Sequence, residues 1–298
     1  MIVMKIAVVT DSGSNYREEG YNVEGVYCVP LTISDENRTY LMGEELSVEE
    51  CYRMVQAGKM LKTSQPPYGR IVALFEQLKA EGYERIFAVP ICSGLSGCIS
   101  AMVTAAEQVG IPLDYVDCYT TAYVELYLAL TARKMLNKGM DPSEVKEILQ
   151  KAALDAVTFV LPVDMKHLVR GGRITKAAGF LAGLLKISPV LIVNKESGGK
   201  NDTYAKPRTL KKAEDVVIDY FREHGVGKGY GICMAHVFNE EEGRNFYNKM
   251  HEEFPEADIY LTPLVSAVGV HTGIGCVACQ FVKKLEYNMD SPGEYTEG

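Results

Sequence analysis

The stretch Arg85-Ile-Phe-Ala-Val-Pro-Ile-Cys-Ser-Gly-Leu-Ser-Gly97 joins an apolar, β-rich run to a serine- and glycine-rich turn, and a helical pattern follows at residues 97–109. A strand, a short loop and a helix in this order form the repeating unit of a parallel sheet covered by helices. Further β-rich runs occur at residues 6–10, 26–33 and 112–117. The first half of the chain therefore predicts an α/β domain with a parallel sheet.

Capping residues mark two helix starts in this half. Ser47-Val-Glu-Glu50 is a capping box, which predicts a helix that runs to about residue 58. Asp141-Pro-Ser-Glu144 combines an N-cap, a proline at the first helical position and an acidic residue, so a helix is expected over 141–154. Amphipathic patterns predict two more helices at residues 67–82 and 120–138.

The pattern changes near residue 156, where a second set of strands and helices begins. A Gly198-Gly199 turn between two β-rich runs predicts a hairpin. We expect one domain at residues 1–156, a second at 157–285 and a flexible tail at 286–298. The second domain has predicted strands at residues 157–163, 189–193, 203–206, 230–236, 258–262 and 276–283, and predicted helices at 209–224 and 239–254.

Composition and charge exclude several classes of protein. The chain has 298 residues, of which 47% are hydrophobic, and its net charge of -8 repels nucleic acid. The first ten residues lack the charged start, apolar stretch and cleavage site of a signal peptide. The longest apolar region, 177–193, contains Lys186 and Pro189 and is shorter than the roughly 20 residues that span a bilayer. We therefore expect a cytoplasmic protein without stable membrane insertion.

The eight cysteines are interpreted as reduced structural thiols, because a chain of this size without a secretory signal rarely uses a disulfide framework. Cys276 and Cys279 form the only CxxC pair, and they fall on a predicted strand. No second Cys pair or His pair supplies further ligands, so no metal site is expected.

Three polar loops are the candidate functional segments: residues 62–65, 92–97 and 269–273. The loop at 92–97 lies between a predicted strand and a predicted helix, where free backbone amides and the helix dipole attract an anion. It contains no Lys or Arg, which favours a carboxylate over a phosphate. The hydroxyls of Thr63 and Ser96 and the ring of His271 could donate to it, although each residue alone is more often a cap, turn or surface group.

A catalytic interpretation is the alternative. Ser96, Asp117 and His271 follow the serine, acid, histidine order of α/β-hydrolases, which would act on a small ester or carboxylated substrate. The G-x-S-x-G elbow is missing, because Cys98 occupies the position of its last glycine. Neither G-x-G-x-x-G after a strand nor H-E-x-x-H occurs.

Five short motifs follow one another along the chain. They are Thr10-Asp-Ser12, Thr63-Ser-Gln-Pro66, Ser93-Gly-Leu-Ser-Gly97, Leu168-Val-Arg-Gly-Gly-Arg-Ile174 and His271-Thr-Gly-Ile-Gly275. In this order and spacing they resemble the DegV family of bacterial fatty-acid-binding proteins over about residues 4–285. Cys98 and Ile274 replace a common Thr and a common Pro of the family, and Gly13 stands where a Thr or Ala usually follows the serine.

The resemblance implies a three-layer α/β/α domain with a parallel sheet and a two-layer α/β domain with a mixed sheet. One long-chain fatty acid would lie between them. The residues matching the family's carboxylate-binding positions are Thr63, Ser96, Gly97 and His271. The acyl chain would enter the second domain, where the apolar residues Phe180, Leu181, Leu184, Leu185 and Ile187 offer a lining, although a plain core helix also accounts for them.

The resemblance also implies a partner. Relatives present the bound acid to a separate fatty acid kinase that makes an acyl-phosphate, so this chain would be a lipid carrier without its own cofactor rather than an enzyme. Arg173 and Arg208 match positions that lie near the carboxylate end in relatives and serve kinase docking or phosphoryl transfer. Both lie in basic clusters that could equally be solvated surfaces.

Overall fold

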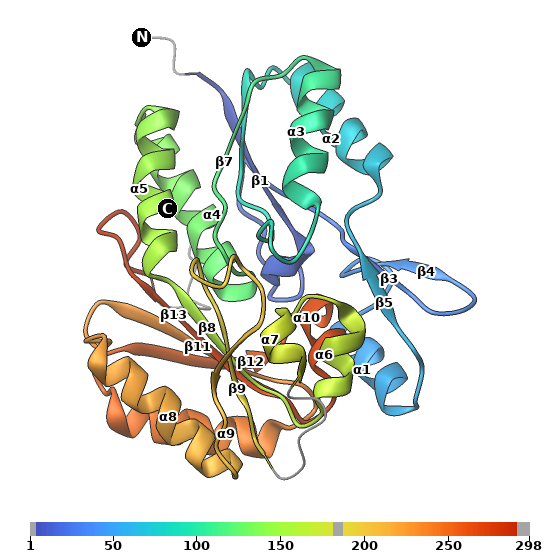
Figure 1. Cartoon of the computed structure of the whole chain (residues 1–298). Helices are drawn as coiled ribbons and strands as arrows, with labels where there is room; N and C mark the ends of the chain where they lie inside the picture. Colours follow the sequence, from blue (N-terminus) through green and yellow to red (C-terminus); the bar gives the residue numbers. More distant parts are fainter. Residues whose placement is uncertain (1–3, 181–186, 291–298) are drawn as a thin grey trace.

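The computed structural model describes residues 4–180 and 187–290 (Figure 1). In its first half, four parallel strands form a sheet in the order β2-β1-β6-β7. This confirms the predicted parallel sheet. The strands are β1 (Ile6–Asp11), β2 (Val26–Val29), β6 (Arg85–Ala88) and β7 (Leu113–Tyr115).

Helices cover both faces of this sheet, as strands that are apolar on both faces require. All six residues of β1 are buried. Ala7 and Val9 face the core beneath α2 (Tyr68–Ala80) and α3 (Cys98–Val109). Ile6 and Val8 pack in the other core, beside α4 (Ala122–Asn137) and α5 (Pro142–Asp155), whose start has the expected Asp141 cap and proline.

The second half forms a six-stranded sheet in the order β10-β9-β8-β13-β11-β12. Only β11 and β12 pair in parallel, so the sheet is mixed, and β9 and β10 form the predicted hairpin. The strands are β8 (Val157–Leu161), β9 (Val190–Val193), β10 (Asp202–Ala205), β11 (Tyr230–His236), β12 (Asp258–Pro263) and β13 (Val277–Lys283).

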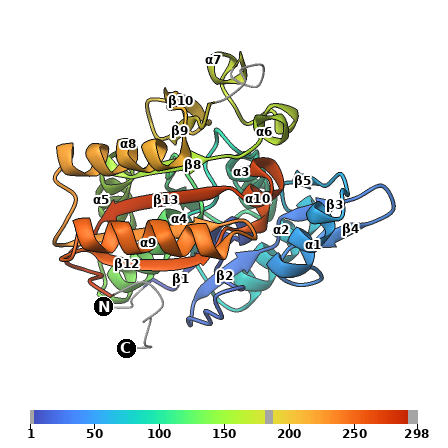
Figure 2. The same cartoon turned by 90° about the horizontal axis from the view of Figure 1, so that it is seen from below.

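The two sheets share one helical layer. α8 (Leu210–Glu223) and α9 (Glu240–Glu253) lie along the outer face of the second sheet (Figure 2). Its inner face contacts α4 and α5, and Cys233 of β11 belongs to the same core as the residues of those helices. This confirms the predicted α/β class, with three layers in the first half of the chain and two in the second. Because α5 ends at residue 155 and β8 begins at 157, we propose that the domain boundary lies at residue 156.

A small antiparallel sheet differs from the prediction. It contains β3 (Thr32–Ser34), β4 (Thr39–Leu41) and β5 (Lys62–Ser64). Between β4 and β5 the chain forms α1 (Val48–Gln56), which begins with the expected capping box. The run at 26–33 is therefore two strands, because Pro30 has no N–H for a ladder. Residues 62–64 were expected in a loop, and their pairing with β3 makes them a strand.

One further expectation is corrected by packing contacts. The loop expected at 269–273 is mostly helix, because α10 (Ser266–Thr272) includes His271. A Cβ on Gly269 would lie 2.1 Å from the Tyr52 hydroxyl, so glycine allows this helix to pack against α1. Of the tail expected at 286–298, residues 291–298 lie outside the described residues, and Asn288 is buried and donates to Thr131.

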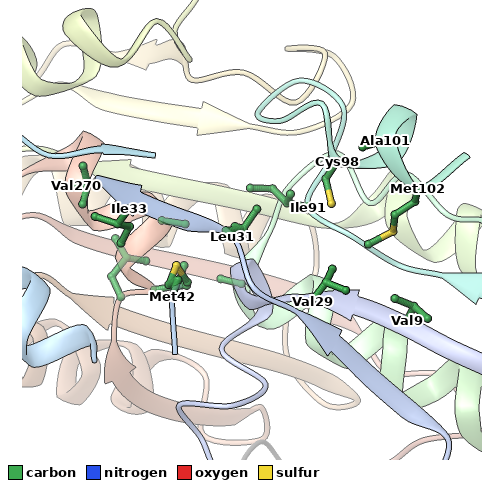
Figure 3. Packing of buried hydrophobic residues seen from close by; sticks show 14 of the residues in the cluster. Val9, Val29, Leu31, Ile33, Met42, Ile91, Cys98, Ala101, Met102 and Val270 are labelled. Carbon is green, nitrogen blue, oxygen red and sulfur yellow. The ribbon is translucent and has the colours of Figure 1, made fainter. Parts of the chain in front are cut away.

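One continuous core connects the first sheet to α10. Figure 3 shows Val9 and Val29 of the sheet close to Met102 of α3, and Ile33 of β3 beside Val270 of α10. Among the described residues, no helix is both long enough and apolar enough to cross a bilayer. The core holds β5, the loop after β6 and α10 together, and these segments meet at a cavity.

Candidate ligand-binding site between the two sheets

A small cavity of about 60 Å³ lies where the first and second sheets meet. Polar residues from β5, the 92–97 loop, α10 and the segment after α6 (Met165–Gly171) line one side, and aliphatic residues line the rest. The polar lining includes Thr63, Gln65, Ser96, Thr121, Thr158, Arg173, Asn201, His271 and Thr272. The aliphatic lining includes Leu31, Ile91, Leu95, Val160, Leu168, Val193, Ala267 and Val268.

Thr63 and His271 are in direct contact at the polar side. The Thr63 Oγ1 atom lies 2.7 Å from His271 Nε2. Burial, helped by the charges of Arg173 and Arg170, lowers the pKa of His271 to about 4. The imidazole is therefore neutral near pH 7 and carries one N–H. Because either this N–H or the Thr63 O–H lies in the bond between the two residues, the pair has one hydrogen left to donate to a ligand.

Glycine at residue 171 makes room for this histidine. A Cβ on Gly171 would lie 2.2 Å from His271 Nδ1. Gly172 then adopts a left-handed conformation with φ of 71° and ends α6. The Arg173 guanidinium donates to the carbonyls of Gly171 and Leu95, at 2.6 and 3.2 Å. The Arg-Gly-Gly-Arg motif thus places a cation on the cavity wall beside His271.

The 92–97 loop brings Ser96 to the same cavity. Ser96 Oγ accepts a hydrogen bond from the Cys98 amide at 3.2 Å, which leaves its hydroxyl hydrogen for another acceptor. A Cβ on Gly97 would lie 2.6 Å from Gln65 Oε1, and one on Gly94 would lie 2.1 Å from the Gly198 carbonyl. The loop glycines therefore allow close contact with both β5 and the β9–β10 turn.

A second, apolar cavity of about 20 Å³ continues from the first along the inner face of the second sheet. Thr121, Thr158, Val160 and Val268 line both cavities. Pockets for drug-sized ligands have volumes of about 300–1,000 Å³. These walls must therefore move apart before a long ligand can enter.

The predicted acyl-chain lining is only partly within the described residues. Leu181, Leu184 and Leu185 lie outside them. Phe180, just after α7 (Lys176–Gly179), is 81% exposed and does not line the cavity, while Ile187 packs against the core that contains α10. The contacts favour a different wall, made of residues on β8, β11 and β13.

Arg173 and Arg208 occupy different places. Arg173 lines the cavity beside His271. Arg208 is exposed after β10 and does not line the cavity. Gln65 also lines the cavity and was not among the predicted site residues. Its position two residues after Thr63, in the same predicted loop, could have indicated it.

The hydrolase arrangement is not assembled. Asp117 accepts hydrogen bonds from the Ser93 hydroxyl and the Tyr119 amide, whereas His271 contacts Thr63. No acid therefore orients the histidine toward Ser96, as a catalytic triad requires. Within the described ranges, no group of three or more His, Cys, Asp or Glu residues is placed to hold a metal ion, and all eight cysteines are free and buried.

The fold and the site define an α/β protein with an enclosed cavity that is rich in hydrogen-bond donors at one end and apolar at the other. A family model described as "Uncharacterised protein, DegV family" matches residues 5–284. The chain belongs to the DegV family.

Relatives and solved structures agree with this assignment. DegV domain-containing protein spr1415 of Streptococcus pneumoniae is 28% identical, over 94% of this chain and 99% of its own length. The fatty acid binding DegV family protein SAG1342 of Streptococcus agalactiae has a TM-score of 0.84 at 27% identity, covering 95% of this chain and all of that one. DegV of Bacillus subtilis, described as a fatty acid binding protein, has a TM-score of 0.82 at 26% identity, covering 94% of this chain and all of that one.

Proposed function

We propose that this protein binds one long-chain fatty acid between its two sheets, with the carboxylate beside Thr63, Ser96 and His271. The observation that carries the proposal is the contact of Thr63 with a neutral His271 at the polar end of a cavity whose other end is apolar. A carboxylate accepts hydrogen bonds only, so the Ser96 hydroxyl and the hydrogen left by the Thr63–His271 pair are suitable donors to it. The solved relatives described as fatty acid binding proteins support the same ligand.

The Arg173 guanidinium adds a positive charge at this end of the cavity. Arg173 lines the cavity and, like Arg170, lowers the pKa of His271, so its charge would lie near the carboxylate of a bound acid. Together with the oriented donors, this charge offsets the loss of water that the carboxylate undergoes on burial.

The acyl chain would extend along the second sheet into the apolar cavity. Ala235, Ala278 and Cys233 are small side chains on this face, and their size leaves room once the walls separate. Removing about 14 methylenes from water stabilises the complex by roughly 11 kcal/mol, before the cost of ordering the ligand and opening the walls. Release to a partner then requires the same opening.

We propose further that the protein is a carrier, which presents the carboxylate to a separate fatty acid kinase for acyl-phosphate formation. The family resemblance implies this role, and two features support it. Arg170 and Arg173 form a basic cluster close to the carboxylate end, which suits the approach of a phosphorylated nucleotide. The nucleophile, base and acid of a hydrolase are not brought together.

Competition between palmitate and 1-hexadecanol tests the binding proposal. The delipidated protein should bind one palmitate per chain and bind hexadecanol at least about tenfold more weakly, because the alcohol places no charge beside Arg173 and His271. Equal affinity for the two ligands, or no saturable binding of palmitate, would overturn the proposed carboxylate site.

A further inference from the structure

A second hollow of the molecule shares no lining residue with the cavity of Thr63 and His271, although Asn15, Thr262 and Pro263 also line the smaller apolar cavity. It is an open groove of about 860 Å³. Its walls come from the segment after β1, the residues around the start of α1, and the ends of β11 and β12. Many of its lining residues are glutamates, and among the described residues that line it none is Lys or Arg. Such a groove attracts cations, but only its unpartnered acceptors define a site.

Most glutamates of the groove already have partners. Glu50 caps α1, and Glu45 accepts from the Leu41 amide and from Arg38. The other ion pairs are Glu44 with Arg17, Glu49 with Arg53 and Glu240 with Arg244. These acids leave little unbalanced charge, so the residues that matter are the remaining two, Glu18 and Glu19.

Glu18 and Glu19 are short of positive partners. Both Glu18 carboxylate oxygens are buried and accept no hydrogen bond from another residue of the described chain, and they lie 3.3 Å from the Cβ position of Gly43. Burial, together with the nearby Glu18 charge, raises the pKa of Glu19 to about 7, although hydrogen bonds from Asn15 and Thr262 lower it. A bound cation would stabilise both charges.

Asn15 supplies an independent sign of a ligand. This residue is only 4% exposed, yet it lines the groove, and its Oδ1 atom has no hydrogen-bond partner in the described chain. Its Nδ2 atom faces the Pro263 carbonyl at 3.4 Å, which fixes the orientation of the amide. The Oδ1 atom is therefore a hydrogen-bond acceptor, and burial of an acceptor without a donor reduces the stability of the fold.

We propose that this groove binds the primary ammonium group of a small alkyl amine. An ammonium group has three donors and no acceptor, which complements the unpartnered oxygens of Asn15 and Glu18 and the nearby Glu19 carboxylate. Leu46 and Val48 line the groove and offer contacts for the alkyl stem. Phe238, whose ring packs edge-on against Tyr52 at 5.5 Å, adds an aromatic surface that favours a cation. The concave shape and size suit a small molecule.

Calorimetric titration with cadaverine (1,5-diaminopentane) and with 1-pentanol tests the proposal. Cadaverine should bind saturably with one site per chain, and pentanol should not bind. Glu18→Gln should weaken cadaverine binding at least about tenfold, because the amide removes the charge at nearly constant shape. Glu49→Gln is the matched control, since it removes the same charge from the same groove at a residue that is already paired with Arg53.

Three results would overturn the proposal: no saturable binding of cadaverine, equal binding of pentanol, or equal losses in the two variants. The last result would show general attraction to an acidic surface. Tighter binding of Nα-acetyl-lysine methylamide than of cadaverine would overturn the assignment to a small amine and favour a lysine side chain of a protein partner. Thermal unfolding of Glu18→Gln checks its fold, and Asn15→Leu, which removes the unpartnered acceptor, provides a second variant expected to lose binding at least about tenfold.

Discussion

The hydroxyl of Thr63 on β5 lies 2.7 Å from Nε2 of His271 on α10, although 208 residues separate them in the chain. The contact joins a strand of the small N-terminal sheet to a helix of the second half. It exists because α10 packs against α1 through Gly269 and because Gly171 leaves space for the imidazole. The proposed carboxylate site is thus a product of contacts between both halves of the chain.

Removal of the Thr63 hydroxyl should weaken fatty acid binding. Thr63→Val keeps the shape of the side chain and removes one donor, so we expect a loss of about 1–3 kcal/mol in binding free energy. His271→Ala should have an effect of similar size. Fluorescence displacement or calorimetry with palmitate measures both variants. Thr104→Val, at an exposed residue of α3, is the matched control and should bind as wild type does. Unchanged affinity in a folded His271→Ala protein would make His271 a structural residue.

A methyl group at residue 171 should disturb the site without touching the ligand. In Gly171→Ala the new Cβ would clash with His271 Nδ1, so the ring must move away from Thr63. We expect palmitate affinity to fall about tenfold. Gly179→Ala serves as the control, because nothing lies within 4 Å of its added Cβ. Equal affinity in the two variants would argue against this packing role for Gly171.

A larger side chain between the two cavities should limit ligand length. Val268 lines both cavities and is only partly buried, so Val268→Phe is tolerated more easily than a change in the core. We expect it to weaken palmitate binding at least about tenfold and octanoate binding much less. Val163→Phe, at a valine that is 70% exposed, controls for the substitution itself. A uniform effect on both acids would contradict the proposed path of the acyl chain.

Arg208 is exposed and outside the cavity, so its proposed role concerns the partner and not the lipid. Arg208→Ala should retain bound fatty acid but fail to support acyl-phosphate formation by a cognate kinase with ATP, because guanidinium groups bind phosphate in a bidentate way. Hydroxylamine trapping at equal lipid occupancy measures the product. Arg53→Ala, on α1, should react as wild type does. Undiminished product with Arg208→Ala would remove Arg208 from the mechanism.

Glu125 should make stability depend on pH. It is fully buried and accepts from the hydroxyls of Thr10 and Thr121, and burial together with the nearby Asp11 raises its pKa well above 4.5. The folded state therefore favours the protonated acid, and this contribution is full below pH 4.5 and is lost as the pH rises through the folded-state pKa. Glu125→Gln should gain stability relative to wild type as the pH rises. Denaturant unfolding from pH 5 to 8 checks this, with the exposed Glu147→Gln as control; parallel pH profiles of wild type and Glu125→Gln would contradict it.

The sequence predicted the main sheets because their signals are local. Alternating apolar runs and capping residues such as Ser47 and Asp141 determine single elements without reference to the rest of the chain. The β5 strand was missed because its three polar residues are held only by pairing with β3. The helix containing His271 was missed because its glycines favour a loop until Tyr52 packs against Gly269.

The candidate site was predictable in part. Loop composition and family motifs indicated Thr63, Ser96 and His271, and all three line the cavity. The family motif indicated that Arg173 lies near the carboxylate end, but its contacts were not predictable, since they depend on the left-handed turn at Gly172 and on the carbonyls of Gly171 and Leu95. Tertiary contacts of this kind have no signature in a single sequence.

Mass spectrometry of the ligand released by denaturing the purified protein tests the central claim most directly. The proposed function predicts one fatty acid of about 14 to 18 carbons per chain, held by burial of its methylenes. It also predicts no covalent labelling of Ser96 by a serine-directed fluorophosphonate. Protein that contains no fatty acid and cannot be loaded with one, while Ser96 becomes labelled, would contradict the carrier function and favour the hydrolase.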